Sequence, residues 1–214
     1  RCSYTVFGVN EFAARFPSVL LGIGTVLATF VIGRRLFSPE VGLLAGIILS
    51  TSIMFQVASR AATPDAALIF CSTFGLMIFV LTTFKSRTES GTRTAPSPRS
   101  AGQYFSPTWL SAAAVYLLFS FGILAKGPVG LILPTAVIGM FLLIIKLPTV
   151  EQLKIPGSWF SRFKERALVM LRCFGPTHFF KTCLQMRLLT ATLIALAVAG
   201  PWYVLVGQRT DGAF

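Results

Sequence analysis

Six long apolar stretches dominate this sequence, and each is close to the roughly 20 residues that a helix needs to cross the hydrocarbon core of a bilayer. The predicted spans are residues 17–33, 41–58, 65–84, 108–125, 128–146 and 188–206. Inside a bilayer every backbone N–H and C=O group must find its partner within the protein, so continuous apolar runs of this length fold as helices. The sequence therefore predicts an all-α polytopic membrane protein with about six transmembrane helices.

The composition agrees with a membrane location. Hydrophobic residues make up 54% of the 214 residues and charged residues only 12%, whereas a soluble domain carries about 25% charged residues. The net charge of +12 does not indicate a nucleic-acid partner, because the basic residues lie in the breaks between apolar stretches rather than in a patch with interleaved aromatic residues. We expect the partners to include membrane lipids and no nucleic acid.

The breaks between the spans carry local signals for helix ends. Ser38-Pro39-Glu40 precedes the second span with a capping residue, a proline and an acid in the first turn, and Thr63-Pro64-Asp65 opens the third in the same way. Gly127-Pro128 separates the fourth span from the fifth so closely that these two form an antiparallel hairpin.

The basic residues are distributed asymmetrically, which predicts an orientation. If the first span runs from outside to inside, fourteen of the 19 Lys and Arg residues lie on the inner side. They are Arg34, Arg35, Lys85, Arg87, Arg93, Arg99, Lys146, Lys154, Arg162, Lys164, Arg166, Arg172, Lys181 and Arg187. The outer side holds Arg1, Arg15, Arg60, Lys126 and Arg209. Because cytoplasmic loops carry an excess of Lys and Arg, both ends of this chain are predicted to be extracytoplasmic.

The spans divide the chain into a transmembrane domain, residues 17–206, and two outer ends, with residues 1–16 ending one extracytoplasmic loop and residues 207–214 beginning another. Basic cytoplasmic loops are predicted at 85–107 and 147–187. The first is rich in Ser, Thr and Pro, which is typical of a flexible polar linker. The second has apolar residues at helical spacing between basic ones, which favours an amphipathic helix lying on the inner leaflet.

The chain begins at Arg1 without a Met or a signal segment and stops eight residues after its last apolar stretch. We therefore expect it to be an internal part of a longer protein. The four cysteines, Cys2, Cys71, Cys173 and Cys183, have no CxxC spacing, and His178 is the single histidine. Neither a disulfide framework nor a histidine-based metal site follows from this pattern.

Five polar residues are predicted at the outer ends of the spans, and each has both a structural and a functional interpretation. Glu11 and Arg15 are spaced as an i,i+4 ion pair. Asp65 suits a helix N-terminus, while Arg60 either extends toward the lipid headgroups or holds an anionic one. Lys126 suits a helix C-terminus, but the glycines at 127 and 130 would let a backbone or a ligand approach, so this lysine could neutralise a lipid-linked phosphate.

Five segments in the same order resemble a known family. They are Asn10–Ser18, Gly33–Phe37, Ser59–Asp65, Leu124–Pro134 and Gly200–Tyr203. Together they are similar to the polyprenyl-phosphate-dependent membrane glycosyltransferases, in particular to the aminoarabinose transferase and protein O-mannosyltransferase-like branch of the GT-C superfamily. The resemblance covers nearly the whole chain.

This resemblance implies an enzyme of the bacterial inner membrane. Such a transferase takes a sugar from a polyprenyl-phosphate-linked donor on the extracytoplasmic face and places it on a lipid, protein or polysaccharide acceptor, as in lipid A modification or protein glycosylation. Its general base is an acidic residue of the first outer loop, which we expect upstream of Arg1. In that case the chain itself does not contain the catalytic acid.

The resemblance also directs attention to particular cations. Charge grows on the departing prenyl phosphate in the transition state, and fixed cations aimed at that charge stabilise it. Lys126 and Arg60 are the candidates for this phosphate clamp. Asp65 would orient Arg60 or contribute to a metal or sugar contact.

Three further residues complete the candidate set. Arg15, with Glu11 as its partner, is a second phosphate candidate, and Asp211 could reach the acceptor or the sugar. No cofactor follows from the residues, and a divalent metal stays open. The alternative functions are a transporter or flippase-like protein for a polar or lipid-linked solute, which needs polar sites near the bilayer midplane, and a noncatalytic assembly subunit.

Overall fold

The computed structural model describes residues 2–61, 63–84, 109–145, 182–184 and 186–210, and this part of the chain is helical without a strand. Its main elements are α1 (Cys2–Phe7), α2 (Glu11–Leu36), α3 (Pro39–Thr51), α4 (Ile53–Arg60), α5 (Asp65–Thr83), α6 (Trp109–Lys126), α7 (Val129–Ile145) and α10 (Leu188–Arg209). The predicted all-α fold class is confirmed.

Four of these helices, α2, α5, α6 and α10, are each long and apolar enough to cross a membrane. The bent pair α3 and α4 gives a fifth candidate, while α7, with 17 residues, is a shorter apolar helix. Each of the six predicted ranges overlaps one of these helices or, for 41–58, the bent pair, which supports a polytopic membrane protein. The count of six crossings stays a prediction.

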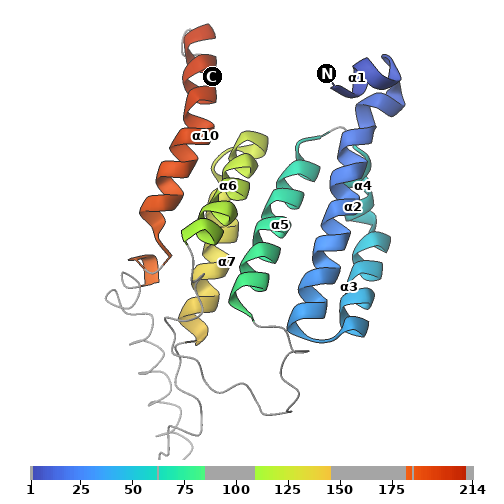
Figure 1. Cartoon of the computed structure of the whole chain (residues 1–214). Coiled ribbons are helices and arrows are strands. Elements are labelled where there is room, and N and C mark those ends of the chain that lie inside the picture. The colour runs from blue at the N-terminus through green and yellow to red at the C-terminus, as the bar shows by residue number, and fades with distance from the viewer. Residues whose placement is uncertain (1, 62, 85–108, 146–181, 185, 211–214) are drawn as a thin grey trace, which may run out of the picture.

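The helices run alternately up and down through one bundle (Figure 1). Along the bundle, α2 packs against α3 and α5, α5 packs against α6, and α6 packs against both α7 and α10. One end of the bundle carries the start of α2, the turn between α4 and α5, the turn between α6 and α7, and the end of α10. We call this end the terminal face. It corresponds to the side predicted to be extracytoplasmic.

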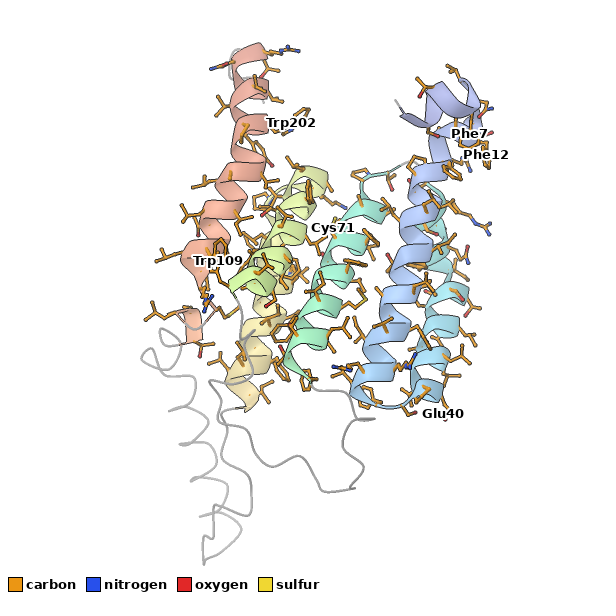
Figure 2. All side chains as sticks on the ribbon, viewed as in Figure 1. Phe7, Phe12, Glu40, Cys71, Trp109 and Trp202 are labelled. Atoms are coloured by element: carbon orange, nitrogen blue, oxygen red, sulfur yellow. The ribbon has the colours of Figure 1, made fainter. Side chains whose placement is uncertain are left out.

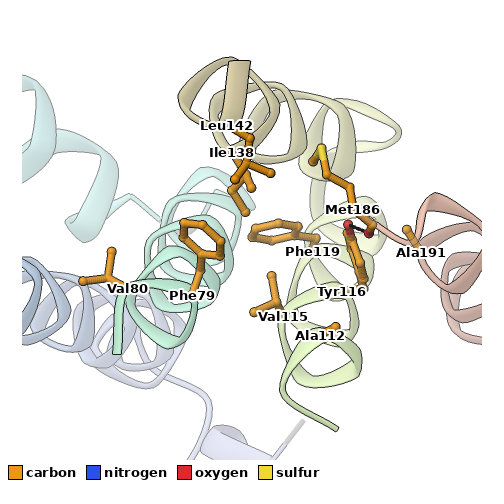
Figure 3. Close-up of a cluster of buried hydrophobic side chains, with 10 residues drawn as sticks. All are labelled: Phe79, Val80, Ala112, Val115, Tyr116, Phe119, Ile138, Leu142, Met186 and Ala191. Carbon is orange, nitrogen blue, oxygen red and sulfur yellow. Dashed lines mark hydrogen bonds between the residues drawn. The ribbon is translucent and has the colours of Figure 1, made fainter. Parts of the chain in front are cut away.

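The core lies where α5, α6 and α7 meet (Figure 3). Tyr116, Phe119, Ile138 and Leu142 are all at most 1% exposed. The hydroxyl of Tyr116 donates a hydrogen bond to the backbone carbonyl of Met186 at 2.5 Å, which ties the segment before α10 to the middle of the chain. Burying this hydroxyl without a partner would cost free energy, so the contact fixes that segment against α6.

Polar caps define two of the helix starts. Asn10 accepts a hydrogen bond from the N–H of Ala13 at 2.8 Å, so α2 begins six residues before the predicted span. Ser38 caps α3 as predicted, and its hydroxyl accepts a hydrogen bond from the N–H of Val41 at 3.3 Å. The predicted cap at Thr63 is wrong, because α5 begins at Asp65 with Pro64 in the capping position and no side-chain hydrogen bond.

The second predicted span, 41–58, is broken rather than continuous. α3 and α4 meet at Ser52 and are bent by 67°. In a row of three hydroxyl residues, Ser50 and Thr51 donate back to carbonyls of the preceding turn, a pattern that competes with regular helix and bends it. The side-chain amide of Gln56 donates to the carbonyl of Ser50 across the break. A polar side chain thus satisfies the backbone where the helix is interrupted.

Several sequence predictions fall outside the described residues. They are the linker at 86–106, nearly all of the amphipathic helix predicted within 147–187, His178, and Asp211 in the loop predicted at 207–214.

Candidate functional site

An ion pair between Lys126 and Asp65 marks the centre of the terminal face. The ammonium of Lys126 at the end of α6 donates a hydrogen bond to the carboxylate of Asp65 at the start of α5, across 61 positions of sequence. Each charge lies at the helix end that its sign favours, because a helix N-terminus attracts anions and a C-terminus attracts cations. The side chains are 55% and 38% exposed, so the pair is accessible from outside the bundle.

The turn after Lys126 is tight. Gly127 has φ +78°, a left-handed conformation that favours glycine, and its N–H bonds the carbonyl of Ile123 at 2.7 Å. α7 then returns so closely that the Cα of Gly130 lies 3.3 Å from where a Cβ on Gly122 would be. The predicted close approach at Gly130 is confirmed, and its partner is the backbone of α6. Lys126 therefore stands on a rigid hairpin.

Arg60 is the second cation of this face, and it ends α4 with an exposed side chain. α4 is held against α2 by a close contact in which the Cβ of Ser59 lies 2.6 Å from where a Cβ on Gly22 would be. The sequence suggested that Asp65 orients Arg60. Among the described residues, however, Asp65 pairs with Lys126, and Arg60 has no carboxylate partner there.

The predicted pair of Glu11 and Arg15 is present in the first turns of α2. The Nη2 atom of Arg15 lies 2.5 Å from the Oε1 atom of Glu11, and both side chains are exposed. Neither residue contacts the Lys126–Asp65 pair in the described part of the chain. A contribution of Arg15 to phosphate binding stays a prediction.

Sequence reasoning missed one residue near the site, Tyr203. No candidate role for this tyrosine follows from the sequence, but its hydroxyl lies 3.8 Å from where a Cβ on Gly127 would be. A signal was present in the spacing, since Tyr203 follows Ala199 by four residues and Ala199 is buried. Residues four apart lie on the same helix face, so this face of α10 turns toward the bundle.

The arrangement suits an anion more readily than a metal ion. Within the described ranges, no three His, Cys, Asp or Glu side chains are grouped so that they could hold a metal. Two cations, Lys126 and Arg60, lie on the same end of the bundle, and one of them is balanced by a single exposed carboxylate. An exposed ion pair contributes only about 0.2–1 kcal/mol, so an incoming phosphate with its larger charge could replace Asp65 at little cost.

Comparison with known proteins bears on this arrangement. Residues 1–91 match the family of dolichyl-phosphate-mannose-protein mannosyltransferases. That match supports a GT-C type of membrane glycosyltransferase. It does not indicate a particular member, and it covers the part of the chain that contains Arg15, Arg60 and Asp65.

Two relatives from Aquifex aeolicus (strain VF5) are also similar, and both carry the description "Uncharacterized protein". One is 32% identical over 158 residues, which is 71% of this chain, and the other is 31% identical over 141 residues, or 66% of this chain. The matched part spans about a quarter, 26%, of the length of each relative. No solved structure matches the chain significantly.

Proposed function

We propose that this chain belongs to a membrane glycosyltransferase that takes a sugar from a polyprenyl-phosphate-linked donor at the extracytoplasmic surface. The observation that carries the proposal is Lys126, a cation fixed by a rigid turn at one end of an apolar helical bundle and paired with a weakly held carboxylate. The family match over residues 1–91 supports the same class of reaction. The donor, the acceptor and the side of the membrane are parts of the proposal.

The chemistry of such a transfer needs a cation at this position. A nucleophilic oxygen or nitrogen of the acceptor forms the new bond to the anomeric carbon, and the bond from that carbon to the phosphate oxygen breaks. The electron pair stays on the polyprenyl phosphate, and the acceptor proton passes to a base, which we expect upstream of Arg1. Lys126 and Arg60 would stabilise the charge that develops on the leaving phosphate.

The position of the cations also suits a lipid-borne donor. The apolar helices α5 and α6 place Asp65 and Lys126 at their ends, and the end of a membrane-spanning helix is where the phosphate of a membrane-anchored carrier would lie. The prenyl chain can then stay in the bilayer while the sugar is presented to an acceptor lipid, protein or polysaccharide outside it. The excess of basic residues in the segments that the sequence predicts to be cytoplasmic supports an extracytoplasmic position for this face.

The experiment that tests the proposal measures glycosyl transfer from polyprenyl-phosphate sugar in membranes containing the intact protein. Lys126→Gln and Arg60→Gln are compared with Arg34→Gln. This control neutralises an exposed arginine near the C-terminal end of α2, at the end of the bundle opposite the terminal face. We expect the Lys126 variant to lose about 100-fold or more in turnover, the size of effect found when one preorganised charge-stabilising group is removed. Turnover equal to that of the Arg34 variant would reject the proposal.

One observation favours the second candidate, a transporter. The break between α3 and α4 gives a discontinuous span, and such spans form the solute sites of many secondary transporters. Here, however, the polar side chains at the break bond backbone carbonyls of the same segment, since Gln56 donates to the carbonyl of Ser50 and Thr51 donates to that of Ile47. These groups are satisfied within the segment, which leaves them little capacity for a solute.

A further inference from the structure

Tyr203 is held against the turn that carries Lys126. Its hydroxyl oxygen is the atom that a Cβ on Gly127 would meet, at 3.8 Å. The neighbouring residues of α10 are turned outward, since Trp202 is 54% exposed and Val204 is 57% exposed, whereas Tyr203 is 38% exposed. Figure 2 shows Trp202 on the part of α10 that extends beyond the ends of α6 and α7. The tyrosine is thus less exposed than either neighbour, and its hydroxyl lies at the turn after Lys126.

An interfacial belt does not account for this placement. A belt tyrosine keeps its ring in the bilayer and directs its hydroxyl to water or headgroups. The hydroxyl of Tyr203 lies beside a glycine that leaves the turn bare, directly after the lysine. A phosphate bound by Lys126 would therefore lie near an O–H donor that comes from another helix.

We propose that the hydroxyl of Tyr203 is part of the anion site and donates a hydrogen bond to the same lipid-borne phosphate that Lys126 neutralises. A lysine ammonium is a compact point charge, whereas a phosphate group has several acceptor oxygens to satisfy. The tyrosine supplies a neutral donor without adding positive charge. The bound phosphate would then connect α6 and α10, with Asp65 on α5 as the group it displaces. This inference rests on the function proposed above.

The test measures binding of polyprenyl phosphate to the protein in nanodiscs of phosphatidylcholine, with uncharged polyprenol as the reference ligand. Tyr203→Phe removes a single oxygen and is compared with Trp202→Phe, which removes the indole N–H of the adjacent, outward-facing residue. We expect Tyr203→Phe to raise the Kd for polyprenyl phosphate about tenfold, the usual effect of losing one hydrogen bond to a charged group. Polyprenol binding should not change, and Trp202→Phe should leave both ligands unaffected.

A double variant tests whether the two side chains share one ligand. Lys126→Met is expected to weaken polyprenyl phosphate binding at least as strongly as Tyr203→Phe. If both groups hold the same phosphate, the double variant Lys126→Met with Tyr203→Phe should lose less binding free energy than the sum of the two single losses, because groups that share one ligand give non-additive effects. Additive losses would overturn the shared site.

The remaining outcomes separate this inference from the proposed function. If Lys126→Met weakens binding and Tyr203→Phe behaves like Trp202→Phe, the role of Tyr203 is overturned and the proposed function stands. If the wild-type protein does not prefer polyprenyl phosphate to polyprenol, the proposed function fails, and the role of Tyr203 with it. A second arm replaces the ligand with phosphatidylglycerol in the nanodisc, and an equal loss for that lipid would overturn the assignment to a polyprenyl carrier.

Discussion

Gly122 and Gly130 bring the backbones of α6 and α7 into direct contact, four residues before and four residues after Lys126. A Cβ on Gly130 would overlap the backbone carbonyl carbon of Gly122, and a Cβ on Gly122 would lie 3.3 Å from the Cα of Gly130. Neither helix can move aside without opening the hairpin, because the obstacle is backbone rather than a flexible side chain. Lys126 can therefore keep its position only if residues 122 and 130 both lack a side chain.

Gly130→Ala should destabilise the protein and displace Lys126. Overpacking of this kind typically costs about 1–3 kcal/mol, and we expect a lower unfolding midpoint in denaturant titrations of the detergent-solubilised protein. The matched control is Gly200→Ala in α10, where a Cβ would meet no atom within 4 Å. That change should be neutral or stabilising by up to about 1 kcal/mol, since alanine favours helix. Equal unfolding midpoints for the two variants would contradict the close packing of the hairpin.

Exchanging the charges of the ion pair separates its structural role from a binding role. Asp65→Lys and Lys126→Asp should each lower the free energy of unfolding by at most about 1 kcal/mol, and the double exchange should recover part of the pair contribution. Turnover should not recover, because the cation no longer stands on the hairpin turn. Thermal unfolding and glycosyl transfer are measured on the same membranes. Recovery of turnover in the double variant would mean that the pair is only structural.

Arg35 connects the C-terminal end of α2 to the C-terminal end of α5, at the end of the bundle opposite the terminal face. Its Nε atom donates to the carbonyl of Phe84 at 2.8 Å, and its Nη2 atom lies 3.5 Å from the carbonyl of Leu81. A cation at a helix C-terminus satisfies carbonyls that have no helical partner. Arg35→Met should therefore lower the free energy of unfolding by about 1–2 kcal/mol.

The neighbouring Arg34 provides the control for this contact, because it is exposed and carries the same charge. Arg34→Met should change the free energy of unfolding by less than about 0.5 kcal/mol, as is usual at an exposed site. Both variants are compared in the same denaturant titration. If they are equally destabilised, the effect comes from net charge rather than from the cap.

Gln56 stabilises the break between α3 and α4, so replacing it should lower the free energy of unfolding. Gln56→Met keeps the length of the side chain but leaves the carbonyl of Ser50 without its amide donor. We expect a loss of about 1–3 kcal/mol in unfolding free energy, the cost of an unsatisfied backbone group away from water. Thr51→Val, which removes an exposed hydroxyl bonded to the carbonyl of Ile47, should have a smaller effect. The opposite order would show that the hydroxyl row, and not Gln56, stabilises the break.

Local residues in the sequence predicted some of the helix ends and turns. Ser38 caps α3, Gly127 adopts the left-handed conformation at the predicted hairpin, and Glu11 pairs with Arg15 at helical spacing. These features depend on residues a few positions apart, so they can be predicted from the sequence directly. The break at Ser52 was missed because a row of small hydroxyl residues does not interrupt an apolar run.

The apolar runs by themselves determined the all-α class, because a chain in lipid must satisfy its backbone within each span. Which helix ends meet was decided only by the tertiary structure. Helices that are apolar on all sides have no amphipathic pattern, so their sequences do not indicate which face packs against the other helices. The sequence therefore placed Asp65 and Lys126 on the same face, but their pairing across 61 residues and the approach of Tyr203 to Gly127 follow from the packing of α5, α6 and α10.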